Sequence, residues 1–230
     1  MPSTPIKVQA FLANLPLFKE LAPEELDRLA LGTREQHAAR GEVLFRKGDP
    51  CEGFHMVVYG HIKLAFTSAS GDEKVVELIG PGQSFGEALM FMERPYIVYA
   101  QALADSLLLH IAKSVVFEEI EREPGFARKM IAGLSRRLHG LISDLESYSM
   151  HSGIQRVIGY LLREEPVADG TSKVMQMRLP ANKGIIASRL NLTPEHFSRI
   201  LHELIAAGLI AVDGRTVTIL DLERLRTFEG

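Results

Sequence analysis

A group of polar side chains at residues 193–199 suits the reading of DNA bases. An arginine can donate two hydrogen bonds to guanine O6 and N7, a glutamate can accept one from cytosine N4, and a serine can bond either. The group opens with Thr193-Pro194, and these residue types favour the N-cap and first turn of a helix. The first turns of a recognition helix enter the major groove. The predicted DNA-contacting residues are Thr193, Glu195, His196, Ser198 and Arg199.

Two of these residues have ordinary alternative roles. Glu195 could stabilise the positive end of the helix dipole, and Arg199 could form an ion pair with Glu195 or Glu203 at i,i+4 spacing. As a set beside a helix cap, however, the residues favour base reading. The apolar residues of the same segment predict a buried helix face formed by Ile200, Leu201, Leu204 and Ile205.

The elements around this helix predict a winged helix-turn-helix over residues 151–230. A first helix over 182–190 contains the small residue Ala187, and Asn191 follows in the turn. Asn tolerates the left-handed backbone that such a turn needs. Gly208 would end the second helix, and Asp213-Gly214 is typical of a hairpin turn. Two helices joined by a turn and followed by a hairpin have this architecture.

The chain before residue 151 divides into two further parts. Residues 1–111 open with helices over 5–15 and 23–31, and continue with short β-rich runs punctuated by glycines, which predict a compact β-roll. Residues 112–150 predict a short helix over 113–121 and a long one over 126–150. The expected fold class is α+β, with a β-roll that senses an effector, a long helix and a winged helix-turn-helix domain.

The long helix carries apolar residues at alternating spacings of four and three. This pattern is the seam of a coiled coil, so we predict a homodimer, although a helix with one apolar face can also pack on its own domain. The predicted interface residues are Leu134, Leu138, Leu141, Leu145 and Tyr148.

Composition restricts the class of protein. The 230 residues carry a net charge of −3, although residues 152–230 hold ten Lys and Arg against nine Asp and Glu. Cys51 is the only cysteine, so the chain cannot build a four-cysteine iron–sulfur cluster, and a reducing cytoplasm is the expected setting. No segment is apolar over the roughly 20 residues that span a membrane. We find no signal peptide and no catalytic motif, and expect no enzyme.

The whole layout resembles the CRP/FNR superfamily of bacterial transcription regulators. The Glu195-x-x-Ser198-Arg199 pattern matches the E-x-x-S-R recognition signature of its fumarate-nitrate-reduction branch. That resemblance implies an inverted repeat of TTGAT half-sites, in which Arg199 reads the guanine, Glu195 the opposite cytosine and Ser198 a thymine. It also implies three partners, namely double-stranded DNA, a second copy of the chain and RNA polymerase, and no membrane.

The effector site departs from the cyclic-nucleotide-binding members of that superfamily. Their phosphate-binding cassette begins Gly-Glu, here Gly86-Glu87, and an arginine eleven residues after the glycine holds the cyclic phosphate. Here Ile97 and then Val98 occupy those places, and an anion buried without a partner is costly. The facing helix offers Leu141 and Ile142. We therefore expect an apolar effector pocket lined by Gly86, Glu87, Ile97, Val98, Leu141 and Ile142, with cyclic nucleotide binding disfavoured.

Two segments resemble the dissimilatory nitrate respiration regulator (Dnr) branch, namely residues 85–92 and 194–200. That resemblance implies a response to nitric oxide or low oxygen through haem in the β-roll, with an axial histidine that the sequence does not identify. A cyclic nucleotide or another small effector is the alternative signal. A purely regulatory ligand-binding module is the alternative class, and it would lack the winged helix.

Overall fold

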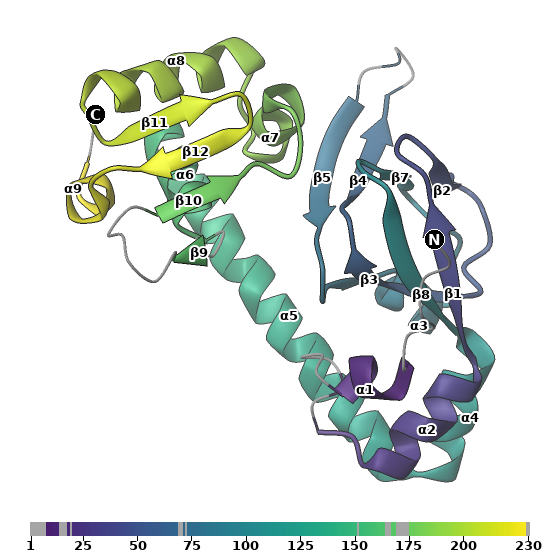
Figure 1. Ribbon diagram of the computed structural model, residues 1–230. Coiled ribbons are helices and arrows are strands. Elements are labelled where there is room, and N and C mark those ends of the chain that lie inside the picture. Colours follow the sequence, from purple (N-terminus) through teal and green to yellow (C-terminus); the bar gives the residue numbers. More distant parts are fainter. Residues whose placement is uncertain are drawn as a thin grey trace, which may run out of the picture. The chain divides into compact units, whose positions relative to one another are not determined.

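The structure of the protein is a computed structural model (Figure 1). It describes residues 8–13, 18, 20–68, 71, 73–150, 152–163, 167–168 and 175–228, with the backbone alone for residues 137, 140–150, 163 and 167–168. The chain forms two compact units, Met1–Gly140 and Leu141–Gly230. No helix in the described ranges combines the length and the apolar character that crossing a membrane requires.

The N-terminal unit is built on two antiparallel sheets. Helices α1 (Val8–Ala13) and α2 (Pro23–Leu31) precede the strands. One sheet has the order β1-β8-β3-β6 and the other β2-β7-β4-β5. The strands are β1 (Thr33–Ala38), β2 (Val43–Phe45), β3 (Gly53–Tyr59), β4 (Ile62–Thr67), β5 (Glu73–Ile79), β6 (Ser84–Phe85), β7 (Tyr99–Ala102) and β8 (Ser106–Ala112).

Three helices follow or interrupt these strands. Helix α3 (Glu87–Phe91) lies between β6 and β7, and α4 (Lys113–Arg122) directly follows β8. The long helix α5 (Pro124–Met150) starts two residues earlier than predicted, because proline is well suited to the first turn of a helix. The expected β-roll and long helix are therefore present.

The core of the N-terminal unit explains why β3 and β8 are central strands. Residues along both strands are buried on consecutive positions, the pattern of a strand covered on two faces. A side chain at Gly53 would come within 2.2 Å of the Ile111 carbonyl oxygen, so this position requires glycine. The largest fully buried side chains here include Phe18, Phe54, Phe85, Met56, Ile62 and Ile79.

Four strands were absent from the sequence prediction, namely β1, β6 and β7 in the N-terminal unit and the short β9 (Val167–Ala168) in the C-terminal unit. Strand β1 has the polar sequence TREQHA, and β7 has the sequence YAQA. Neither segment shows the alternation of apolar and polar residues that identifies a half-buried strand. Strand β1 forms because its whole length, from Thr33 to Ala38, pairs with the apolar strand β8.

The first two turns of α5 pack on the core of the N-terminal unit, whereas two apolar side chains further along α5 are exposed. Phe126 and Met130 are buried in the core. Ile131 is 62% exposed and Leu138 is 59% exposed, while Leu134 is half-buried. The side chains of the predicted interface residues 141, 145 and 148 lie outside those that the structure describes.

The C-terminal unit is the predicted winged helix-turn-helix. Its sheet has the order β11-β12-β10-β9, and β11 pairs with β12 as an antiparallel hairpin. The small C-terminal helix α9 was not predicted. The elements are α6 (Gly153–Arg163), β9 (Val167–Ala168), β10 (Met175–Arg178), α7 (Lys183–Arg189), α8 (Pro194–Ala206), β11 (Ile210–Asp213), β12 (Thr216–Ile219) and α9 (Leu222–Arg226).

Candidate nucleic-acid interface and effector cavities

The two helices of the helix-turn-helix each begin at a side-chain cap, of which only the Thr193 cap of α8 was predicted; Asn182, predicted as the first residue of its helix, is instead the N-cap of α7. The Asn182 side-chain oxygen accepts a hydrogen bond from the Ile185 amide at 2.9 Å, which caps α7. Asn191 has a φ of 56°, the left-handed conformation expected for the turn. The Thr193 hydroxyl oxygen accepts from the His196 amide at 3.2 Å and caps α8. Local side-chain chemistry thus fixes where the second helix begins.

The buried face of α8 matches the prediction at three of four positions. Ile200, Leu201 and Leu204 are at most 2% exposed, and Phe197 is fully buried. Ile205 is 39% exposed, so the prediction that it belongs to the buried face was wrong. Helix α8 ends at Ala206, one residue after Ile205. The next buried apolar side chain along the chain is that of Leu209.

The opposite face of α8 exposes the predicted reading residues. Thr193, Glu195 and Arg199 are exposed, and Ser198 is half-buried. Within the described residues Arg199 forms no ion pair with Glu195 or Glu203, so the alternative role of Arg199 has no support. Its guanidinium is available to a ligand.

His196 has a different environment from the other predicted reading residues. It is half-buried, and a Cβ atom placed on Gly153 would lie 3.2 Å from the His196 Cε1 atom. The imidazole therefore packs against the first residue of α6. This contact gives His196 a packing role at the start of the recognition helix.

Sequence reasoning missed Arg156 on α6, whose side chain donates hydrogen bonds to the turn between α7 and α8. Its Nη1 group donates to the Leu190 carbonyl at 2.8 Å and to the Asn191 carbonyl at 3.4 Å. The Arg156 Nε atom is buried without a partner. Arg156 lies off the apolar face of α6 formed by Ile154, Val157, Ile158 and Leu161, and its partners are 34 and 35 residues away, so no local pattern identified its role.

The predicted effector residues do not all line one described cavity. Gly86 has a φ of 98° and caps α3, whose first residue Glu87 is 3% exposed. Ile97, 52% exposed, and Val98 line a cavity of about 480 Å³ together with Arg46 and other residues. Gly86 and Glu87 are not among the lining residues, and the side chains at 141 and 142 lie outside the described ones.

A buried lysine contacts two residues that line that cavity, Glu73 and Tyr99. Lys63 is 5% exposed, and its ammonium donates to the Glu73 carboxylate at 2.6 Å. The Tyr99 hydroxyl donates to the same carboxylate, and the Lys63 ammonium lies 5.3 Å from the centre of the Tyr99 ring. A buried charge needs such a partner, so this network stabilises the sheet.

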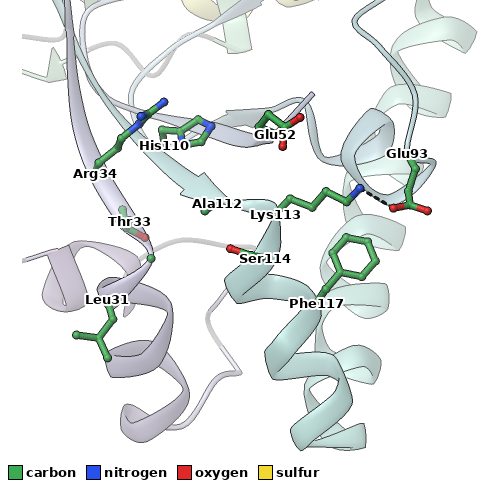
Figure 2. Close-up of a pocket in the computed structure, with 11 residues that line it drawn as sticks. Leu31, Thr33, Arg34, Glu52, Glu93, His110, Ala112, Lys113, Ser114 and Phe117 are labelled. Atoms are coloured by element: carbon green, nitrogen blue, oxygen red, sulfur yellow. Dashed lines mark hydrogen bonds and ion pairs between the residues drawn. The ribbon is translucent and has the colours of Figure 1, made fainter. Parts of the chain in front are cut away.

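A larger cavity of about 850 Å³ opens between β1, β8 and α4 (Figure 2). Arg34 and Glu52 stand on either side of the His110 ring, and Leu31 and Phe117 form opposite apolar sides. Lys113 pairs with Glu93 at 2.5 Å. The full lining consists of Leu31, Gly32, Thr33, Arg34, Glu52, Glu93, His110, Ala112, Lys113, Ser114 and Phe117.

Two histidines form a buried pair beneath this cavity. His55 and His110 are directly opposite on neighbouring strands, with ring centres 4.9 Å apart in an edge-on arrangement. Burial, together with the smaller effects of the neighbouring His110 and Arg34, lowers the pKa of His55 to about 3. Burial likewise lowers the pKa of His110. Both imidazoles are therefore neutral at pH 7.

The comparisons with known proteins agree with this architecture. Residues 35–123 match the family model of the cyclic nucleotide-binding domain, and residues 155–228 match that of the Crp-like helix-turn-helix domain. The crystal structure of DNR from Pseudomonas aeruginosa is 32% identical, with 99% of this chain and 100% of that chain covered and a TM-score of 0.57. The chain belongs to the CRP/FNR superfamily of transcription regulators.

Two further relatives cover most of this CRP/FNR regulator. A candidate cyclic nucleotide binding protein from Ruegeria pomeroyi is 31% identical over 96% of both chains, with a TM-score of 0.71. The cyclic AMP receptor protein of Thermus thermophilus is 29% identical over 204 residues, which are 89% of this chain and 92% of the relative. The relatives thus include proteins named for a cyclic nucleotide, so the family does not by itself identify the effector.

Proposed function

We propose that this CRP/FNR regulator is a homodimer that binds an inverted repeat of TTGAT-like half-sites through α8. The observation that carries the proposal is the exposed pair Glu195 and Arg199 at the N-terminal end of a capped helix, where Arg199 forms no ion pair within the described residues. In this proposal Arg199 donates to guanine, Glu195 accepts from the opposite cytosine and Ser198 contacts a thymine. In the same proposal Thr193 and His196 contact DNA from the first turn of α8.

The dimer places the two recognition helices on one face of DNA. Leu138 and Ile131 are seven residues apart on α5, which is two turns, and both are largely exposed. A monomer would leave this apolar pair in water, whereas a second α5 would bury it. We propose the interface through Leu134, Leu138, Leu141, Leu145 and Tyr148, with Ile131 extending it by one position. Half-sites about one helical turn apart would then match the two α8 helices.

A gel-shift titration tests the DNA-reading assignment. The wild-type chain should prefer an inverted TTGAT repeat over random duplex, with an affinity that falls steeply with salt. Arg199→Ala should lose about 1–3 kcal/mol on the repeat and discriminate less at the guanine. Arg178→Ala, an exposed arginine on β10, is the matched control. Equal losses of Arg199→Ala on specific and random duplexes would show that Arg199 contacts phosphate and not a base.

The signal is a second part of the proposal. We propose that the β-roll responds to nitric oxide or low oxygen and not to a cyclic nucleotide. Two observations support this view: Ile97 supplies no cation for a cyclic phosphate, and DNR from Pseudomonas aeruginosa is 32% identical over nearly the whole chain. In this proposal residues 1–111 sense the signal, 112–150 carry it, and 151–230 bind DNA and present the complex to RNA polymerase.

Haem is the cofactor that the Dnr-like resemblance implies, and the described cavities fit it poorly. The cavity at Ile97 and Val98 contains no histidine, cysteine or methionine among its lining residues. His110 lines the larger cavity, but it is 8% exposed and packs edge-on against His55. Tyr99 lines the cavity at Ile97 and belongs to a residue type that can ligate haem, but its hydroxyl donates to the Glu73 carboxylate, so we assign no haem ligand. If haem bound, it would supply the iron centre that nitric oxide ligates.

Spectroscopy separates the candidate signals. If haem is the cofactor despite the poor fit of the described cavities, titrating it into the chain will give a saturable Soret shift at one haem per chain, and nitric oxide will then change the affinity for the TTGAT repeat. Calorimetry with cyclic AMP on the same preparation tests the alternative. Tight cyclic AMP binding without stoichiometric haem uptake would replace haem by a cyclic nucleotide in this proposal and leave the DNA-binding part unchanged.

A further inference from the structure

The larger cavity of the β-roll holds two opposite charges that do not pair with each other. Arg34 and Glu52 are both exposed, and both line the cavity of about 850 Å³. In the part of the chain that the structure describes, neither side chain forms an ion pair or a hydrogen bond. Opposite charges that line one cavity and stay apart leave room for a ligand that carries both signs.

The remaining charges of the cavity are already neutralised. Lys113 pairs with Glu93 at 2.5 Å, and its ammonium lies 5.4 Å from the centre of the Phe117 ring. His110 lies between Arg34 and Glu52 (Figure 2), and burial keeps its imidazole neutral at pH 7. A ligand therefore meets one unpaired cation and one unpaired anion, separated by a neutral ring.

The rest of the lining is apolar and accessible. Leu31 is 89% exposed, although leucine is among the residues most often buried. Phe117 is half-buried on the opposite side of the cavity, and Ala112 lies between them. An apolar group that contacts Leu31 or Phe117 would remove that side chain from water, which is favourable in proportion to the apolar area buried.

We propose that this cavity binds a zwitterionic amino acid with an apolar side chain. Arg34 holds the carboxylate, Glu52 holds the ammonium group, and the apolar part of the lining contacts the side chain. Arginine suits a carboxylate because its planar fork can donate two parallel hydrogen bonds. The site is separate from the cavity at Ile97 and Val98, and it requires neither haem nor DNA binding to be correct.

The position of the cavity connects it with the start of the cassette. Arg34 on β1 is paired with His110 on β8, His110 with His55 on β3, and His55 with Phe85 on β6. Phe85 directly precedes Gly86, the N-cap of α3. The ring of His55 is also stacked on that of Phe85, with centres 5.1 Å apart. A bound amino acid would thus contact one end of a continuous row of side chains that reaches α3.

Calorimetry with leucine and two truncated analogues tests the ligand class. The analogues are 4-methylpentanoate, which lacks the ammonium group, and 3-methylbutylamine, which lacks the carboxylate. Because a hydrogen bond to a charged group is worth about 1.5–3 kcal/mol, leucine should bind at least about tenfold more tightly than either analogue. Methionine and phenylalanine are titrated in parallel as alternative apolar side chains.

Substitutions assign the two charges separately. Arg34→Gln should reduce the affinity for leucine about tenfold or more and leave the affinity for 3-methylbutylamine unchanged. Glu52→Gln should reduce the affinity for leucine by a similar factor and leave the affinity for 4-methylpentanoate unchanged. Arg40→Gln, an exposed arginine outside the cavity, is the control. Substitutions at such exposed positions change stability by at most about 0.5 kcal/mol, so the variants should fold, and thermal unfolding checks this.

Three results would overturn the inference. The first is the absence of saturable binding by leucine, methionine and phenylalanine at millimolar concentrations. The second is 4-methylpentanoate or 3-methylbutylamine binding as tightly as leucine, since one of the two charges would then be idle. The third is leucine affinity that survives both Arg34→Gln and Glu52→Gln, or that falls equally in Arg40→Gln. DNA binding by the same preparations, measured separately, reports on the proposed function alone.

Discussion

Replacing Arg156 should disturb DNA recognition although this residue lies on α6 and not on α8. The Arg156 guanidinium donates a well-formed hydrogen bond to the Leu190 carbonyl at 2.8 Å and a longer one to the Asn191 carbonyl at 3.4 Å. Leu190 ends α7 and Asn191 has the left-handed φ of the turn. Helix α8 begins at Pro194, three residues after Asn191. Arg156→Ala therefore removes the hydrogen-bond donor that fixes the turn directly before α8.

The cost follows from leaving a buried carbonyl without a partner. Leu190 is 2% exposed, and an unsatisfied buried acceptor costs about 1–3 kcal/mol. The longer bond to Asn191 adds little, because hydrogen bonds weaken beyond about 3.2 Å. At 2 kcal/mol the ratio of folded to unfolded molecules falls about 30-fold, and the melting temperature of a unit of this size falls by about 8–16 °C.

Two measurements separate stability from positioning. Urea unfolding gives the free energy of unfolding, and gel shifts at a temperature where every variant is folded give the ratio of specific to random DNA affinity. Arg156→Ala should lower both quantities, Arg156→Lys should recover part of each, and the exposed control Arg178→Ala should change neither. A destabilised Arg156→Ala variant with an unchanged specificity ratio would refute the positioning role, and an unchanged free energy of unfolding would refute the hydrogen-bond argument itself.

Three further predictions follow from burial and backbone geometry. Leu138→Glu should convert the dimer to monomer in sedimentation, because a charge in an apolar seam lacks a partner; a persistent dimer would place the interface elsewhere. The pKa of His55 is lowered to about 3 in the folded state, so the unfolded chain takes up a proton near pH 6.5, and stability should fall from there toward pH 3 by about 1.4 kcal/mol per pH unit for this histidine. His55→Gln should show a shallower decline in urea unfolding across that range, and an unchanged slope would contradict it. Gly159→Ala should stabilise α6 by about 0.5–1 kcal/mol because a Cβ there meets nothing within 4 Å, whereas Gly53→Ala should prevent the N-terminal unit from folding normally, as thermal melts would show.

The DNA-reading half could be predicted because its signals are local. Thr193 and Pro194 indicate the start of α8, and Asn191 indicates the turn, because the interactions involved span only three or four residues. The buried face follows the helical repeat until the helix ends, and Ile205 was misplaced because the sequence does not show what covers the last turn. Arg156 was missed for the same reason, since its partners are 34 and 35 residues away.

The β-roll was harder because its contacts depend on strand register. The polar strand β1 forms only through its pairing with β8, so its own residues carry no strand signal. The cavity beside it brings Arg34 together with Glu52, His110 and Phe117 from four places in the sequence. No spacing rule connects these residues, so neither the cavity nor its unpaired charges could be predicted.

The exposure of Ile97 shows how one fold can accept different signals. A position that is 52% exposed contributes little to the core, and exchanges at exposed positions seldom change stability by more than about 0.5 kcal/mol. If position 97 is where the cyclic-nucleotide-binding relatives place their phosphate cation, as we propose, an apolar residue there leaves the β-roll intact, because Gly86 caps α3 and the Phe85 ring stacks on His55. In our proposals, fold and effector depend on different residues: buried positions such as Phe85 preserve the roll, and exposed cavity residues such as Ile97 and Arg34 set which charges a ligand must carry. Similarity over the whole chain consequently identifies the regulator family, whereas the effector has to be inferred from a few rim side chains.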